Sequence, residues 1–153
     1  MKLTDTFTFD GDQETVWKLL MDPAVIAKAI PGVDQLVPLE GEINAWRATA
    51  KIGIASINGV FSGIVRMSEI EAPTQYRLTV SGEGQQSFIG GTGLLKLHYD
   101  TAAQKTILTW DADANISGKL ASIAQRVITA AAIMLSKQFF KCVANELPSS
   151  SKS

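Results

Sequence analysis

Hydrophobic and polar residues alternate along most of the chain up to residue 116, and this period of two predicts β-strands. The first alternating segment is 3–9, in which Phe7 and Phe9 share one face. Further alternating segments follow after residue 32, with turn-forming residues between them. These segments are 33–39, 43–54, 59–70, 76–82, 91–99 and 106–116. The pattern therefore predicts a first strand and then six strands in a meander.

Three other segments have the residue spacing and the boundary residues of helices. Asp12 is a suitable N-cap for a short helix at 13–21. An Asp-Pro pair begins a second short helix at 24–30, and a Pro-Gly pair ends it. The segment 117–147 is rich in Ala, Leu, Ile and Gln, which predicts one long helix.

This order of elements predicts an α+β fold of the helix-grip type. A curved antiparallel sheet has one apolar face that must be covered, and only the C-terminal helix is long enough to cover it. We therefore expect a seven-stranded sheet around that helix, with two short helices after the first strand. The chain of 153 residues suits a single domain at 1–147, followed by a disordered tail at 148–153.

Two glycine signals along the strands predict turns. Asn58–Gly59 is the strongest hairpin signal in the chain. The stretch "GEGQQSFIGGTG" (82–93) holds five of the twelve glycines, but Ser87 stands where a G-x-G-x-x-G motif needs its third glycine. The stretch also joins two predicted strands, whereas a phosphate loop leads into a helix. We therefore predict a bend at 82–93 and no phosphate site.

Composition and charge exclude several classes of function. The net charge is −1, which gives no electrostatic basis for binding nucleic acid or an anionic membrane. Cys142 is the single cysteine, so an internal disulfide is excluded and a reducing, cytoplasmic compartment is expected. The apolar segment 120–136 contains Gln125 and Arg126 and is shorter than a membrane span, so we expect a buried helix of a soluble protein.

The inward faces of the predicted strands and of the long helix are apolar and contain many Ala and Gly residues. Because protein interiors are close-packed, small residues on both sides mean either that the helix lies close to the sheet or that an apolar cavity lies between them. The residues alone do not decide between these two possibilities. The inward residues that would line a cavity are Trp46, Ala48, Ala50, Phe61, Met67, Leu78, Val80, Leu95, Leu97, Trp110, Ala112 and Ala114 on the strands and Ile123, Val127, Ala131 and Met134 on the helix.

Few residues are candidates for catalysis. Acid–base or nucleophilic chemistry needs an ionisable group in the cavity, and the inward set offers only Tyr76. Arg126 borders the helical stripe and could contact a polar end of a ligand. His98 alternates onto the polar face, Cys142 lies among apolar residues, and no metal site follows from one histidine and one cysteine. The domain is therefore expected to be a non-catalytic container.

Three blocks of the sequence resemble the CoxG family of carbon monoxide dehydrogenase subunits, within the START-like (SRPBCC) helix-grip superfamily. "VWKLLMDPAVIAKAIPGV" (16–33) resembles the family's V-W…L-x-D-P…I-P-G segment. "KIGIASINGVFSG" (51–63) resembles its V-G-I…G-x-F-x-G hairpin, and "GKLASIAQRVI" (118–128) resembles its helix signature. The resemblance extends over about residues 3–147.

The resemblance implies an accessory protein of a molybdenum-containing, carbon-monoxide-dehydrogenase-like hydroxylase. The family is linked to recruitment of that enzyme to the cytoplasmic membrane and to a cavity for a quinone, so the expected ligand is a quinone or another lipid. The cavity entrance is expected at Ile30, Pro31, Gly32, Phe88, Gly90 and Gly91. Since the sequence ends at "PSSSKS" without the long extension of some members, only weak or transient membrane contact is expected.

Two alternatives to a carrier follow from the same observations. START-like folds include cyclases and other aromatic-ring enzymes, in which case Tyr76 and Arg126 are the residues to test. The other alternative is an assembly factor for the hydroxylase, with a collapsed core and no ligand. A cavity smaller than a few water molecules would favour this last hypothesis.

Overall fold

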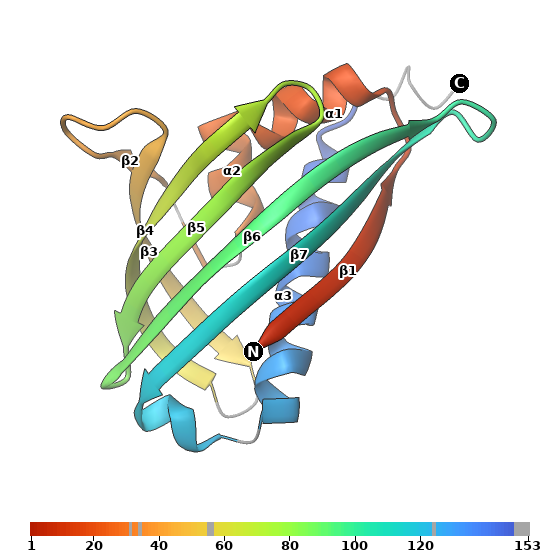
Figure 1. The fold of residues 1–153 in the computed structure, drawn as a ribbon. Coiled ribbons are helices and arrows are strands. Elements are labelled where there is room, and N and C mark those ends of the chain that lie inside the picture. Colours follow the sequence, from red (N-terminus) through yellow and green to blue (C-terminus); the bar gives the residue numbers. More distant parts are fainter. Residues whose placement is uncertain (31, 34, 55–56, 124, 149–153) are drawn as a thin grey trace.

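The computed structural model describes residues 1–30, 32–33, 35–54, 57–123 and 125–148. Two short helices follow the first strand, six strands come next, and a single turn of 3-10 helix precedes the long C-terminal helix (Figure 1). The elements are β1 (Lys2–Phe9), α1 (Gln13–Leu20), α2 (Pro23–Ala29), β2 (Val37–Pro38), β3 (Ala45–Ile54), β4 (Ile57–Glu71), β5 (Gln75–Gly84), β6 (Ser87–Asp100), β7 (Lys105–Gly118), η1 (Lys119–Ser122) and α3 (Gln125–Asn145).

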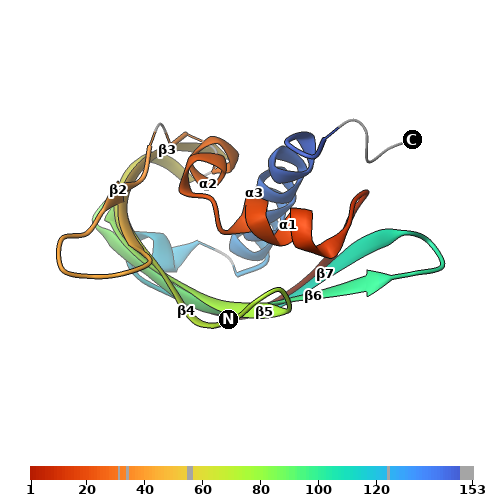
Figure 2. The ribbon, with the colours of Figure 1, turned by 90° about the horizontal axis from the view of Figure 1, so that it is seen from above.

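The strands form one antiparallel sheet of seven strands in the order β1-β7-β6-β5-β4-β3-β2. Strands β2 to β7 pair in sequence as a meander, and β1 closes the sheet by pairing with β7. Seen from above, the sheet curves around α3, and α1 and α2 lie over the same concave side (Figure 2). The predicted α+β helix-grip fold is therefore confirmed.

Side-chain caps set where the two short helices begin. Asp12 precedes α1, and its Oδ1 accepts a hydrogen bond from the Thr15 backbone N–H at 2.7 Å. Asp22 precedes α2 and accepts from the Ala24 N–H at 2.9 Å. Each cap satisfies one of the free N–H groups at a helix start. The first cap directs Trp17 of α1 into the core.

We expect Asp12→Ala to lower the free energy of unfolding by about 1 kcal/mol at neutral pH, the usual effect of losing an N-cap. Hydrogen bonding from Thr15 lowers the pKa of the Asp12 carboxyl below 3.8. A lowered folded-state pKa stabilises the fold above the unfolded pKa, and this contribution is lost as the pH falls through the folded pKa. Urea unfolding at pH 7 and at pH 3 measures both effects.

Asp12→Asn is the matched control for this change, because asparagine caps a helix about as well as aspartate and does not titrate. It should retain the wild-type stability at pH 7. On going to pH 3 it should lose less stability than the wild type, because residue 12 no longer titrates. An Asp12→Ala variant as stable as the wild type at neutral pH would contradict the capping role.

Of the two turns predicted from glycine signals, the one at Asn58–Gly59 is wrong, whereas the bend within 82–93 is present as the β5–β6 hairpin. Asn58 and Gly59 lie inside β4, where they pair with Gly53 and Ile52 of β3, and residues 55–56 lie outside the described residues. The stretch 82–93 is two paired strands around a short turn at 85–86, so Gly90 to Gly93 belong to β6. These glycines lie within strands, where glycine marks a bulge or a close approach.

Two other elements are shorter than their predictions. The strand expected at 33–39 is reduced to the two residues of β2. The long helix expected from Ser117 begins only at Gln125, because β7 continues to Gly118 and η1 intervenes. Gly118 has φ +87°, a left-handed conformation that suits glycine and ends the strand before η1.

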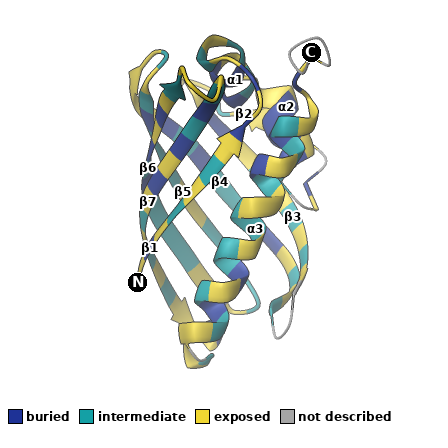
Figure 3. Ribbon diagram, turned by 90° about the vertical axis from the view of Figure 1, so that its right-hand side faces the viewer, coloured by how far each residue is buried: buried dark blue, intermediate teal, exposed yellow. Residues whose placement is uncertain are grey.

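The helix α3 covers the concave face of the sheet. Its buried residues are Ile128, Ala131, Phe140 and Val143, and its other side is exposed (Figure 3). The helix is long and apolar enough to cross a membrane by length and composition alone, with a mean hydropathy of 1.4. In this structure it is a partly buried core helix of the fold.

The core is concentrated where α1 and α2 meet the sheet. Phe9 and Phe140 pack edge to face with ring centroids 6.2 Å apart, and Trp17 of α1 packs edge to face on Tyr76 at 5.7 Å. Val16 and Leu20 of α1 are fully buried in the same cluster. The helices α1 and α2 thus fill one end of the concave face with large side chains.

Candidate functional site

A cavity of about 450 Å³ lies between the concave face of the sheet, α2 and the C-terminal half of α3. This volume is within the range of ligand pockets in proteins. It corresponds to roughly 15 water molecules at the volume of each in the liquid. The helical walls are Ile26, Ile30 and Val33 on one side and Leu135, Ser136, Phe139 and Phe140 on the other.

Small residues on neighbouring strands create this space. Gly63 of β4 pairs with Ala48 of β3 and with Gly82 of β5, and all three line the cavity. In the next row, Gly91 of β6 pairs with Ala114 of β7. These small residues lie among the larger Val65, Val80 and Ile89 of the same lining and leave space above the concave surface at their positions.

Val80 shows that this space is open. It lies on the inner face of β5 and lines the cavity, yet 38% of its surface is exposed. Leu78, Ala48 and Ala114 line the same cavity and are only half-buried. An apolar surface of this kind, on the concave side of a sheet, suits an apolar ligand.

Large aromatic residues close the opposite end. Tyr76, Leu95 and Trp110 form one row across β5, β6 and β7, and Phe139 and Phe140 of α3 line the same cavity. Tyr76 is 2% exposed. Gly82 is six positions after Tyr76 on β5, so the lining extends over about 20 Å along this strand.

The inner face of the described sheet carries no charged side chain at the cavity. Ser62, Thr92 and Asp113 border it, but strand alternation places their side chains on the outer face. Asp113, for example, pairs with the N-terminal amine at 3.4 Å. Tyr76 and Ser136 therefore supply the polar side-chain atoms, and burial raises the pKa of the Tyr76 phenol, which keeps it neutral.

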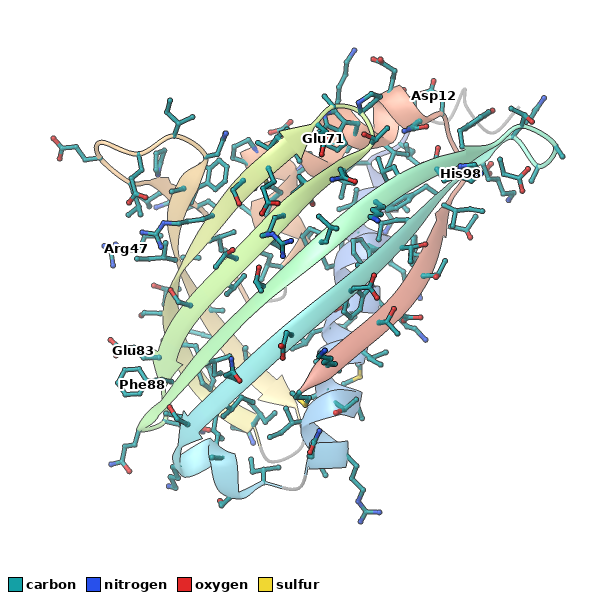
Figure 4. All side chains as sticks on the ribbon, in the orientation of Figure 1. Asp12, Arg47, Glu71, Glu83, Phe88 and His98 are labelled. Carbon is teal, nitrogen blue, oxygen red and sulfur yellow. The ribbon has the colours of Figure 1, made fainter. Side chains whose placement is uncertain are left out.

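Among the described residues no group of three or more His, Cys, Asp or Glu side chains could hold a metal ion. His98 is exposed, as the alternation predicted, and lies near the end of β6 (Figure 4); Asp111 of β7 is also exposed. Cys142 is partly buried and packs against the hydrophobic core.

The structure brings most of the predicted strand residues together around one cavity. Ile30 and Gly91, which we expected at its entrance, also line it, as does Tyr76. The predicted strand residues that line the cavity are Ala48, Ala50, Phe61, Met67, Leu78, Val80, Leu95, Trp110, Ala112 and Ala114. Trp46 and Leu97 are instead buried in the core, outside the lining.

The four predicted helical positions are not in the lining. Met134 is 41% exposed, Val127 is half-buried and outside the lining, and Ala131 is buried without lining the cavity. Ile123 precedes α3 altogether. The predicted stripe assumed a continuous helix from residue 117, whereas α3 begins at Gln125 and docks with a different side toward the cavity. Arg126 is exposed at the start of α3, so it is not placed to contact a ligand.

Two predicted entrance residues point away from the cavity. Phe88 is 63% exposed on the outside of the sheet, beside Glu83 at the β5–β6 hairpin (Figure 4). Gly90 shares its face, because β6 begins at Ser87 and alternation places Ile89 and Gly91 inward. Pro31 lies outside the described residues.

Several lining residues were missed. Leu135 and Phe139, and likewise Ser136 and Phe140, are four apart and so share one side of α3. This spacing is present in the sequence, but the predicted stripe used the preceding turns of the helix, from Ile123 to Met134. Ile26 and Val33 were missed because the packing of α2 on the cavity depends on tertiary contacts.

Gly32 is outside the lining and holds the α2–β2 connection against β3. Its carbonyl accepts a hydrogen bond from the Lys51 N–H at 3.2 Å, and Val33 bridges to Ala50. Gly32 has φ +81°, and an added Cβ would lie 2.1 Å from the Lys51 carbonyl oxygen. This backbone contact closes the gap between α2 and β3.

We expect Gly32→Ala to destabilise the protein by about 2–3 kcal/mol, because the left-handed conformation and the clash with β3 act together. Gly41→Ala is the control: Gly41 has φ +83°, but an added Cβ would meet nothing within 4 Å. That variant should cost only about 1 kcal/mol. Urea unfolding of both variants measures the difference. Equal losses of unfolding free energy would show that the clash with β3 contributes nothing to the effect of Gly32→Ala.

Residues 6–148 match the family profile described as CoxG, a subunit of carbon monoxide dehydrogenase. A conserved protein from Geobacillus kaustophilus is 34% identical, with a TM-score of 0.89, and the match covers 95% of this chain and 94% of that chain. Comparison with curated proteins found no significant match.

More distant solved structures share the fold. A START superfamily protein from Mycobacterium smegmatis has a TM-score of 0.68 at 10% identity, with 94% of each chain covered. The di-domain ARO/CYC StfQ from the steffimycin biosynthetic pathway has a TM-score of 0.66 at 13% identity, covering 94% of this chain and 50% of that chain. At these identities the similarity shows the fold alone.

Proposed function

The chain belongs to the CoxG family of carbon monoxide dehydrogenase subunits, and on this premise we propose that it is a non-catalytic carrier of an apolar ligand, a quinone or another lipid. The carrier would serve a molybdenum-containing, carbon-monoxide-dehydrogenase-like hydroxylase. The observation that supports this most directly is the cavity of about 450 Å³ with an almost entirely apolar wall. Binding would rest on burial of apolar surface, at about 25 cal/mol per Å².

The cavity favours a carrier over the two alternatives. A ligand-free assembly factor needs no open space, whereas Val80 is 38% exposed inside the fold. Acid–base catalysis needs an ionisable group beside the substrate, and the described lining offers the phenol of Tyr76 alone. Burial raises the pKa of this phenol, which makes it a poor general base near neutral pH.

The family name links the protein to carbon monoxide dehydrogenase, and this link is the basis for proposing that the carrier serves such a hydroxylase. A quinone held in the cavity would accept electrons from the hydroxylase at the inner face of the cytoplasmic membrane. The protein would be cytoplasmic and would contact the membrane only while it exchanges its ligand. We propose that such contact also helps to recruit the hydroxylase.

Native mass spectrometry of the purified protein, followed by organic extraction, tests the proposal. A bound quinone or lipid at a stoichiometry near one per chain is the expected result. A protein that carries nothing and also fails to bind added menadione and decanoic acid would contradict a carrier function. Such a protein would instead favour the assembly-factor hypothesis.

A further inference from the structure

The Tyr76 hydroxyl is a buried polar group without a protein partner. None of the hydrogen bonds found among the described residues involves it, although its side chain is only 2% exposed. The oxygen is also not sealed off, because no fully enclosed side-chain nitrogen or oxygen among the described residues lacks a partner. Since Tyr76 lines the cavity, a ligand held there can bring an acceptor to this hydroxyl.

A hydroxyl in this position has an energetic cost that a phenylalanine would avoid. Leaving a buried donor unpaired costs about 1–3 kcal/mol, and buried polar groups in proteins nearly always have partners. The ring is held in place by Trp17, which packs edge to face at 5.7 Å and 83°. The hydroxyl is thus oriented by packing and lacks only an acceptor.

The surroundings indicate which part of a ligand reaches this hydroxyl. Trp110 lies in the same cross-strand row as Tyr76, and Phe139 and Phe140 complete an aromatic wall. Flat, conjugated rings pack well against such a wall. At the other end, about 20 Å along β5, Gly82 and Gly63 leave room for an aliphatic part.

We infer that the Tyr76 hydroxyl is the polar anchor of the cavity and donates a hydrogen bond to a carbonyl oxygen on the ring end of the ligand. This inference rests on the proposed carrier function and adds the ligand's class and orientation. A neutral phenol donates one hydrogen bond, and burial keeps this phenol neutral at physiological pH. A hydrocarbon of the same shape would leave the hydroxyl unpaired and bind more weakly.

The test compares fluorenone with fluorene, two flat rings that differ in one carbonyl group. Calorimetric titration of the full chain should show that the wild type binds fluorenone about threefold to tenfold more tightly, the usual net effect of one neutral hydrogen bond. Tyr76→Phe should bind both compounds with equal affinity. The carbonyl stretching band of bound fluorenone should lie at a lower frequency in the wild type than in this variant.

Ser136→Ala tests the rival donor, because it removes the second hydroxyl in the cavity lining. It should keep the preference for fluorenone. Equal affinity of the wild type for both compounds, or a preference that Ser136→Ala removes and Tyr76→Phe keeps, would overturn the anchor and leave the carrier function standing. If the wild type binds neither compound, the anchor is overturned, and the carrier function is decided separately by native mass spectrometry and by binding of menadione and decanoic acid.

Discussion

Replacing Ala114 by phenylalanine should weaken ligand binding by tenfold or more and, at the same time, raise the thermal stability of the empty protein. Ala114 lies on the inner face of β7, and its Cβ is 3.7 Å from where a Cβ on Gly91 would be. The new ring would extend over Gly91 into open space. Filling a cavity commonly stabilises a protein by about 0.5–2 kcal/mol.

The double variant Ala114→Phe/Ala48→Phe should show no measurable binding, because rings would enter the cavity from both sides of the curved sheet. Fluorenone titration measures binding, and a thermal melt of the empty protein measures stability. Weaker binding combined with higher stability makes the test specific. In a collapsed, well-packed core the same ring would lower the free energy of unfolding by about 1–3 kcal/mol. A destabilised single variant would therefore contradict an open cavity.

Asn115→Phe serves as the matched control for the single variant. Asn115 is the next residue on β7, is exposed, and lies on the opposite face of the strand. The same side chain added there leaves the cavity unchanged, so affinity for fluorenone should remain at the wild-type level. Loss of binding in this control would mean that any bulky change in β7 disturbs the sheet.

The strand part of the fold and of the site could be predicted from the sequence because strand alternation is a local property. Once β5 is identified, Tyr76, Leu78 and Val80 must share one face. The same argument places Ala112 and Ala114 beside Trp110 on β7. A curved sheet has one covered face, so these residues necessarily face the helix.

The glycines could not be interpreted in the same way. Gly91 and Gly93 fall both in the bend predicted at 82–93 and in the strand predicted at 91–99, and the structure places both in β6, facing the cavity. Only the pairing partners of each strand distinguish a glycine in a turn from a glycine within a strand. Gly91 pairs with Ala114 and Gly93 with Ala112, so small residues lie opposite one another across the sheet. This pairing is a tertiary property that one strand's sequence does not contain.

The helical wall was mispredicted for a related reason. In a helix the inward side depends on how the helix is docked, and α3, which begins at Gln125 after η1, packs on α2 and on the sheet. Apolar residues surround much of this helix, so several stripes satisfy the same spacing. Contact with α2 and the sheet selects Leu135 and Phe139 for the cavity and leaves Met134 exposed.

Trp17→Ala should cost about 3–5 kcal/mol in the free energy of unfolding, the usual effect of truncating a buried tryptophan. Trp17 is 8% exposed and lies behind Tyr76, outside the cavity lining. Its removal should also release the Tyr76 ring and so abolish the preference for fluorenone over fluorene. Chemical unfolding near 15 °C, where stability is usually greatest, and titration with both compounds measure the two effects.

Two further variants separate the loss of stability from the loss of the anchor. Leu108→Ala should cost about 2–5 kcal/mol, since Leu108 is fully buried, but it lies outside the cavity lining and should keep the fluorenone preference. Trp17→Phe retains an aromatic ring beside Tyr76. It should keep most of the stability and most of the preference for fluorenone. If Trp17→Ala loses stability but discriminates between the compounds as the wild type does, Trp17 supports the fold without orienting the hydroxyl.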